Sequence, residues 1–169
     1  MKTFESSLDK PKSGLDGAVW TEDWPPYLND TAQSVINQVV AYAQSTFKLP
    51  PFKLHIIGSI TSNQWTPTTD IDLHFCCPTF RAEAAEEFNK LFRDWFKNVY
   101  AAAGNPSKIA EHPIEIYMQP NEMQDYMSVG CYDVLERKWD VGPDLAPLDY
   151  NPIAAWWNID MQKVDETVT

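Results

Sequence analysis

Two strand-like segments separated by a glycine turn constrain the fold of this chain more than any other feature. The first, FKLHII at residues 52–57, is apolar and runs directly into Gly58-Ser59. The second, DIDLHFCC at residues 70–77, alternates polar and apolar side chains, as expected of a strand with one buried face. We therefore expect two strands whose connection begins with a tight turn, the second carrying its acidic side chains on one face.

Two amphipathic helices are expected around these strands. The first is capped at Asp30 or Thr31, repeats apolar residues at helical spacing and ends at residues 49–51, where Leu-Pro-Pro stops it. The second runs over residues 80–103, where alanine, phenylalanine, leucine and tryptophan recur at i, i+3, i+4 and i+7. Gly104 is a fitting C′ residue for this longer helix, which is expected to cover the core.

A further strand and a hairpin complete the expected sheet. The segment IEIYM at residues 114–118 alternates, so that Glu115 and Tyr117 share one face. Residues 131–141 suit a strand-turn-strand. The order helix, strand, turn, strand, helix, strand predicts an α+β fold, close to α/β, in which helices flank a small mixed sheet.

The chain is expected to form a single domain with extensions. Its 169 residues, of which 44% are hydrophobic, suffice for one core. Residues 1–29 are rich in Pro, Gly, Asp and Trp and predict an irregular arm, so the domain itself spans residues 30–169. The side chains expected to pack this arm are Trp20, Trp24 and Tyr27. An aromatic C-terminal segment, with Trp156 and Trp157 on a helix, is predicted to contact a second copy of the chain or a protein partner.

Charge narrows the class of partner. Twenty-four acidic residues against thirteen basic ones give a net charge of −11, and no basic run is longer than Arg137-Lys138. Such a surface repels long nucleic acid, so a small molecule or a protein is favoured, and a nucleotide carried with metal ions is compatible. No segment reaches the roughly 20 apolar residues of a membrane span, and the N-terminus lacks the apolar region of a signal peptide. We therefore expect a cytoplasmic protein without membrane contact.

The three cysteines and three histidines are expected to have structural roles. Three cysteines, two of them adjacent, match neither a disulfide framework nor a zinc-ligand spacing, so buried thiols in a reducing compartment are expected. His55 and His74 fall on the two strands, and His112 falls in an expected loop.

The paired carboxylates of the second strand point to metal chemistry. Asp70 and Asp72, at i and i+2, share one face with Cβ atoms about 6–7 Å apart. This separation suits two metal ions about 3.5–4 Å apart that share a bridging carboxylate. Magnesium prefers such hard oxygen ligands, and manganese accepts them too. A third acid from a neighbouring strand would complete the site.

The glycine turn adds a candidate phosphate contact. Gly58 has no Cβ to keep a phosphate from the backbone, and Ser59 brings a hydroxyl. Amides at the start of the following turn would point toward the anion. Thr61, Ser62 and Asn63 offer further donors.

The order of these motifs resembles the polymerase beta nucleotidyltransferase superfamily. The matching segments are HIIGS at 55–59, TDIDLHF at 69–75 and PIEIYM at 113–118. The resemblance covers roughly residues 31–118, most of the catalytic core of such a domain, and it implies a nucleotidyltransferase fold.

The resemblance also assigns a role to each part of the motif. It implies that Gly58 and Ser59 contact the triphosphate and that Asp70, Asp72 and Glu115 are the catalytic ligands of two magnesium ions. From the residues alone the third ligand stays open. Its alternatives are Glu111, Glu122 and Asp125.

These inferences predict a metal-dependent nucleotidyltransferase. It would move a nucleoside monophosphate from ATP or another nucleoside triphosphate to an acceptor hydroxyl and release pyrophosphate. The alternative is a module that keeps the fold without turnover and regulates a protein partner, and a purely structural component is a third class. The nucleobase, the acceptor, the oligomeric state and the pathway stay open at this point.

Overall fold

The computed structural model describes residues 14–120 and 130–145. The expected C-terminal helix with Trp156 and Trp157 lies outside these ranges, as do Glu122 and Asp125. The elements in chain order are α2 (Asp30–Phe47), β1 (Lys53–Ile57), the 3-10 turn η1 (Ser59–Thr61), β2 (Ile71–Cys76), α3 (Ala82–Trp95), the π-helix η2 (Phe96–Ala101), β3 (Lys108–Ile109), β4 (His112–Gln119), β5 (Cys131–Asp133) and β6 (Lys138–Val141).

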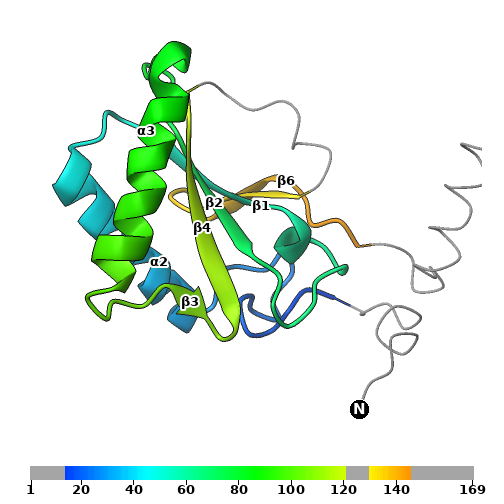
Figure 1. Ribbon diagram of the computed structural model, residues 1–169. Helices are drawn as coiled ribbons and strands as arrows, with labels where there is room; N and C mark the ends of the chain where they lie inside the picture. Colours follow the sequence, from blue (N-terminus) through cyan, green and yellow to red (C-terminus); the bar gives the residue numbers. More distant parts are fainter. Residues whose placement is uncertain (1–13, 121–129, 146–169) are drawn as a thin grey trace, which may run out of the picture.

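A single mixed sheet organises the molecule. Its strand order is β3-β4-β2-β1-β5-β6, with β2 parallel to β4 and every other pair antiparallel. The parallel pair needs a long crossover, and α3 provides it. Both helices lie against the same face of the sheet (Figure 1). The predicted α+β class with a small mixed sheet is confirmed.

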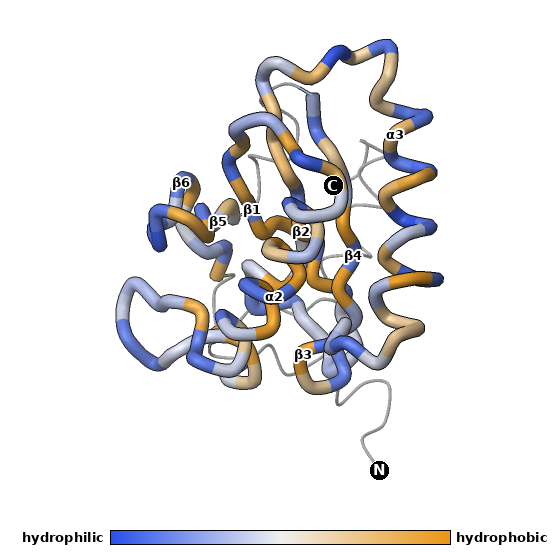
Figure 2. The backbone as a smooth tube through the Cα atoms, turned by 90° about the vertical axis from the view of Figure 1, so that its left-hand side faces the viewer, coloured by the Kyte–Doolittle hydropathy of each residue, from blue (hydrophilic) through white to orange (hydrophobic). Residues whose placement is uncertain are grey.

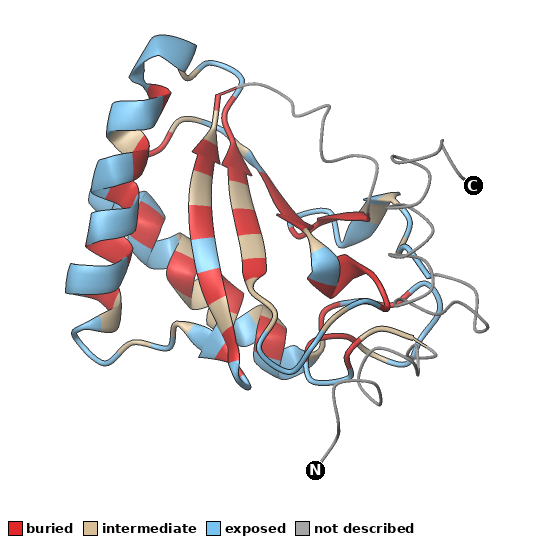
Figure 3. Ribbon diagram, turned by 45° about the vertical axis from the view of Figure 1, so that its right-hand side comes forward, coloured by how far each residue is buried: buried red, intermediate tan, exposed pale blue. Residues whose placement is uncertain are grey.

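Alternation along β2 separates the two faces of the sheet. Ile71, Leu73 and Phe75 are fully buried, whereas the residues between them are half-buried. The same banding runs along β4, where buried and accessible residues follow one another (Figure 3). The buried residues meet the helices, so the polar residues occupy the opposite face. The predicted division of the 70–77 segment is therefore confirmed.

Aromatic packing joins the helices to the sheet. Phe92 of α3 is fully buried. Its ring centroid lies 5.4 Å from that of Phe47 on α2 and 5.1 Å from that of Phe75 on β2. Edge-to-face pairs of this kind add about 0.5–1.5 kcal/mol each to the free energy of apolar burial. Phe92 thus links three elements across the core.

The N-cap of the first helix lies one residue before the nearer of the two expected positions. Asn29, rather than Asp30 or Thr31, is the N-cap, because its side-chain oxygen accepts a hydrogen bond from the Ala32 amide at 2.8 Å. The helix ends at Phe47, just before the Leu-Pro-Pro segment at residues 49–51 that was predicted to stop it. Lys48 then adopts a left-handed conformation with φ 54°.

The second helix is shorter and less regular than predicted. Instead of one helix over residues 80–103, α3 ends at Trp95 and continues as the π-helix η2. Hydrophobic and hydrophilic residues alternate along α3 turn by turn (Figure 2). Gly104 has φ 93°, the left-handed conformation expected of it, but it lies two residues after the C-cap Ala102 and therefore one residue beyond the predicted C′ position.

A side chain from α3 fixes β4 in place. Asn89 is almost fully buried, and its amide group donates to the Met118 carbonyl at 3.0 Å. Its oxygen accepts from the Met118 amide at 2.7 Å. The short strand β3, which the sequence did not predict, pairs only with the start of β4. Asn89 therefore satisfies backbone groups that β4 presents beyond the end of β3.

The three aromatic residues of the N-terminal arm differ in how they pack. Trp20 is buried, and its indole nitrogen donates to the Ile60 carbonyl at 2.9 Å. Trp24 is 68% exposed and does not pack the arm. Tyr27 is 38% exposed, and the Arg137 guanidinium lies 5.3 Å from its ring centre. No helix in the described ranges is both long enough and apolar enough to cross a bilayer.

Replacing Asn89 by alanine should destabilise the fold by about 2–4 kcal/mol, since two buried backbone groups of Met118 would lose their partners. Urea unfolding measures this change in free energy. Asn98→Ala is the matched control, because Asn98 is exposed and bonds only an exposed carboxylate, that of Asp94. The control should change stability by no more than about 0.5 kcal/mol. Equal effects of the two substitutions would contradict the role given to Asn89.

Candidate functional site

Three carboxylates converge on the face of the sheet away from the helices. Asp70 lies just before β2, Asp72 lies on β2 and Glu115 lies on β4. Oxygen atoms of the three side chains all lie within 4.8 Å of one another. The parallel register sets Asp72 directly beside Glu115, so two of the three acids are held by adjacent strands. The structure thus brings together the three acids that the sequence singled out.

The glycine turn lies against this acid cluster. Gly58 has φ 91° and ψ −170°, a conformation that glycine adopts without strain. A Cβ atom built on Gly58 would lie 2.6 Å from Oδ2 of Asp72, closer than real Cβ contacts allow. The absence of a side chain at Gly58 therefore makes room first for the Asp72 carboxylate. Its contact with a triphosphate stays a prediction.

The cluster concentrates negative charge that its surroundings do not neutralise. Burial first, and then the Glu115 and Asp70 carboxylates, raise the pKa of Asp72 from 3.8 to about 6. The pKa of Glu115 is also raised, by burial first and then by Asp70, whereas Arg93 opposes the shift. The raised pKa values show that the ionised carboxylates are disfavoured when no cation is present. Carboxylate oxygens at this spacing fit a divalent cation of the magnesium type, which would favour the ionised form.

A cleft of about 450 Å³ opens beside the carboxylates. The residues that line it are Asp72, His74, Arg93, Glu115, Ile116, Tyr117 and Gln119. The rings of His74 and Tyr117 lie 5.0 Å apart, and the Arg93 guanidinium lies 5.4 Å from the Tyr117 ring centre. Burial lowers the pKa of His74 to about 4, with smaller effects from His55 and Arg93, so the imidazole is neutral at pH 7. The cleft therefore combines an acidic end, a cation and flat aromatic surfaces.

The hydroxyl groups near the turn differ in their availability. Ser59 is exposed at the start of η1. Thr61 is buried and donates to the Gly58 carbonyl at 2.6 Å, and Ser62 is buried and donates to the Ser59 carbonyl at 2.9 Å. Both inner hydroxyls brace the turn. Their contact with a substrate stays a prediction. The exposed Ser59 hydroxyl is better placed than either to donate a hydrogen bond to a phosphate.

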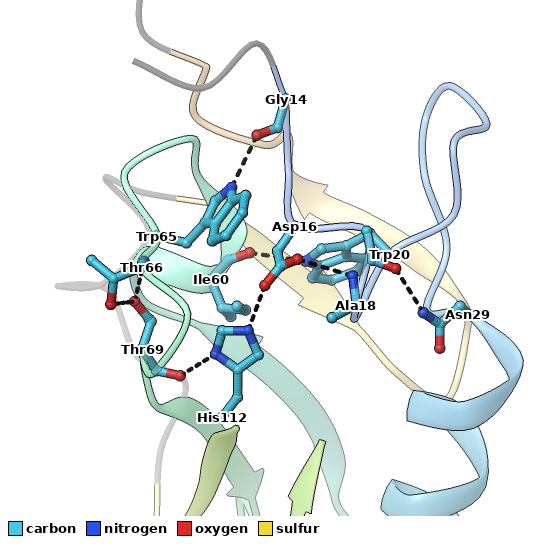
Figure 4. Close-up of polar contacts among 11 residues, drawn as sticks. Gly14, Asp16, Ala18, Trp20, Asn29, Ile60, Trp65, Thr66, Thr69 and His112 are labelled. Atoms are coloured by element: carbon cyan, nitrogen blue, oxygen red, sulfur yellow. Dashed lines mark hydrogen bonds and ion pairs between the residues drawn. The ribbon is translucent and has the colours of Figure 1, made fainter. Parts of the chain in front are cut away.

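A histidine outside the predicted site positions one of its acids. His112, expected in a loop, is instead the buried first residue of β4. One ring nitrogen donates to the Thr69 carbonyl at 2.7 Å, and the other bonds the Asp16 carboxylate (Figure 4). His112 thereby ties the residue before Asp70 to the N-terminal arm. No local pattern in the sequence signals this contact, since Asp16 and His112 are 96 residues apart.

Comparison with protein-family models, with curated proteins and with solved structures finds no match for this chain. The functional argument therefore depends on the geometry and charge of the chain's own residues.

Gly58→Ala should destabilise the protein much more than Gly104→Ala. Both glycines have positive φ values, 91° and 93°, but a Cβ on Gly104 meets nothing within 4 Å. We expect a loss of about 1–2 kcal/mol for Gly104→Ala from backbone strain alone. For Gly58→Ala we expect at least about 1 kcal/mol more, because Asp72 must move. Urea unfolding of both variants measures this difference, and equal losses would contradict the close approach of Asp72 to the turn.

Asp72→Asn should stabilise the protein when divalent ions are removed. Because folding raises the pKa of Asp72 from 3.8 to about 6, the folded state binds its proton more tightly than the unfolded state. This contribution to stability is present below pH 4 and is lost as the pH rises through about 6. At pH 7 in a chelator the substitution should add on the order of 1 kcal/mol, allowing for the carboxylate's partial exposure.

Thermal unfolding between pH 4 and 8 tests this expectation, with the exposed Glu111→Gln as control. The pH-dependent loss of stability should be smaller in Asp72→Asn and unchanged in Glu111→Gln. A lower stability of Asp72→Asn at pH 7 would show that the carboxylate is not destabilising there.

Proposed function

We propose that this chain is a metal-dependent nucleotidyltransferase of the polymerase beta-like superfamily. It would transfer a nucleoside monophosphate from a nucleoside triphosphate to an acceptor hydroxyl, with release of pyrophosphate. The observation that carries the proposal is the convergence of Asp70, Asp72 and Glu115 beside the Gly58 turn. Each acid comes from the segment that the family resemblance assigns to it.

The carboxylates fit the metal ions that such a reaction uses. Three carboxylates within 4.8 Å of one another repel each other, and this repulsion contributes to the raised pKa of Asp72. Asp70, Asp72 and Glu115 would hold two magnesium ions, for which manganese could substitute. Bound there, the ions would supply charge neutralisation at the phosphate and a lowered pKa for the attacking hydroxyl.

The remaining cleft residues would orient the nucleotide. Arg93 offers a fixed positive charge and a planar group able to bond phosphate oxygens in pairs. Tyr117 and the neutral His74 offer flat faces on which a base can stack. These groups are carried by β2, β4 and α3, whose backbones are packed elements of the fold.

A small molecule or a protein is a better candidate for the acceptor than a long nucleic acid. A net charge of −11 repels a long polyanion, and within the described residues Arg93 is the cation that lines the acidic cleft. A small hydroxyl compound, or a serine, threonine or tyrosine of a protein, enters such a site without this repulsion.

The test combines nucleotide binding with turnover. With magnesium or manganese present, one of the four nucleoside triphosphates should stabilise the protein thermally, by about 2.7 kcal/mol at 100 times its dissociation constant. Asp70→Asn, Asp72→Asn and Glu115→Gln should each abolish the metal-dependent part of this shift and the release of pyrophosphate. Glu111→Gln should retain both, since Glu111 lies outside the cluster of three acids.

The outcomes separate enzyme from binding module. Pyrophosphate release that survives all three acidic substitutions contradicts the proposed mechanism. Metal-dependent nucleotide binding without any product, across a panel of hydroxyl acceptors, favours a regulatory module instead. No stabilisation by any nucleotide contradicts the nucleotide site itself.

A further inference from the structure

A second polar cluster lies on the same face of the sheet, beyond β1. His55 on β1 pairs directly with His74 on β2, so the two side chains leave the sheet on the same side. His55, Cys131 and Asp140 offer ligand atoms that all lie within 4.8 Å of one another. They come from three different strands, β1, β5 and β6. In contrast to the all-oxygen acid cluster, this one combines nitrogen, sulfur and oxygen.

The distance between two of the three ligand atoms suits a tetrahedral metal site. Nε2 of His55 lies 3.0 Å from Oδ2 of Asp140. Two ligands at about 2.0–2.1 Å from a tetrahedral ion are about 3.3 Å apart, so a metal can replace the hydrogen bond with little movement. Cys131 is fully buried and Asp140 is about one-quarter exposed at its side chain, so the cluster has a rigid inner side and an outer side that solvent reaches.

The other ring nitrogen of His55 contacts a second cysteine. Nδ1 lies 3.6 Å from the sulfur of Cys76 on β2. When one imidazole nitrogen binds a metal, the other carries the proton and donates it to a neighbouring group, which fixes the tautomer. When Nδ1 carries the proton, the Cys76 sulfur can accept its hydrogen bond, and Nε2 is then left for the metal. Cys76 would act as a positioning residue and not as a ligand.

The same residues fit a nucleophilic cysteine less well than a metal site. Burial raises the pKa of Cys131 to about 12, with Asp140 making the largest electrostatic contribution. A nucleophilic cysteine needs the opposite shift and an exposed sulfur.

We propose that His55, Cys131 and Asp140 bind Zn²⁺ or a similar transition-metal ion, with a fourth position open to solvent. Mixed nitrogen, sulfur and oxygen ligands select such ions over magnesium, which the acid cluster suits. The site does not depend on the nucleotidyltransferase proposal. It holds β1, β5 and β6 together at the edge of the sheet, next to the candidate nucleotide cleft.

Cobalt(II) is the probe, since a cobalt–thiolate bond gives a charge-transfer absorbance that oxygen ligands do not. The full chain is titrated with Co²⁺ in excess Mg²⁺, which occupies the acid cluster. The chain has three cysteines, so the band reports on Cys76, Cys77 or Cys131. We expect saturation at one equivalent and loss of the band when Zn²⁺ is added. Absence of a band in the native chain overturns the proposal.

Substitutions assign the ligands. Cys131→Ser should lose the band, whereas Cys77→Ser should keep it, because the buried Cys77 thiol contacts the Pro50 carbonyl instead. Asp140→Asn, at an accessible position, should weaken Co²⁺ binding by about tenfold or more, and Asp72→Asn should leave it unchanged. A band that survives Cys131→Ser, or unchanged affinity in Asp140→Asn, overturns the site. If Cys131→Ser does not fold, Asp140→Asn decides the question.

Discussion

The parallel pairing of β2 with β4 is the contact on which the rest of the structure depends. It requires a crossover, which α3 supplies, and Asn89 locks that helix to the backbone of β4. The same pairing sets Asp72 beside Glu115. Because both helices cover one face only, the strands present apolar residues to one side and polar residues to the other. The core and the candidate site are therefore two sides of one pair of strands.

The fold holds the three carboxylates of the site close together although they repel one another. Asp72 must be partly desolvated beside two other carboxylates, and its raised pKa reports that cost. The opposing contribution comes from the other side of the strand, where Leu73 and Phe75 are fully buried. Destabilising groups persist in native proteins where the surrounding fold over-determines their position, and such places are commonly functional. The glycine at residue 58 belongs to the same arrangement, since any larger residue would displace the Asp72 carboxylate.

Features encoded by neighbouring residues could be predicted from the sequence, and features made by distant residues could not. Alternation predicted which side chains of β2 are buried, and the family resemblance singled out Asp70, Asp72 and Glu115, which lie together in the structure. No periodicity could predict that β4 runs parallel to β2, or that Asn89 binds the edge of β4. The His55–Asp140 contact, which joins residues 85 apart, was missed for the same reason. The N-cap error at Asn29 is local, because three adjacent residues can all cap a helix.

The tether from the N-terminal arm to His112 has a consequence for biosynthesis. Asp16 leaves the ribosome 96 residues before its partner does. At about 5–20 residues per second, the arm waits roughly 5–20 s before His112 can anchor it. Until then the Thr69 carbonyl lacks its hydrogen bond from His112. The acidic pocket therefore acquires its final shape only after His112 has emerged.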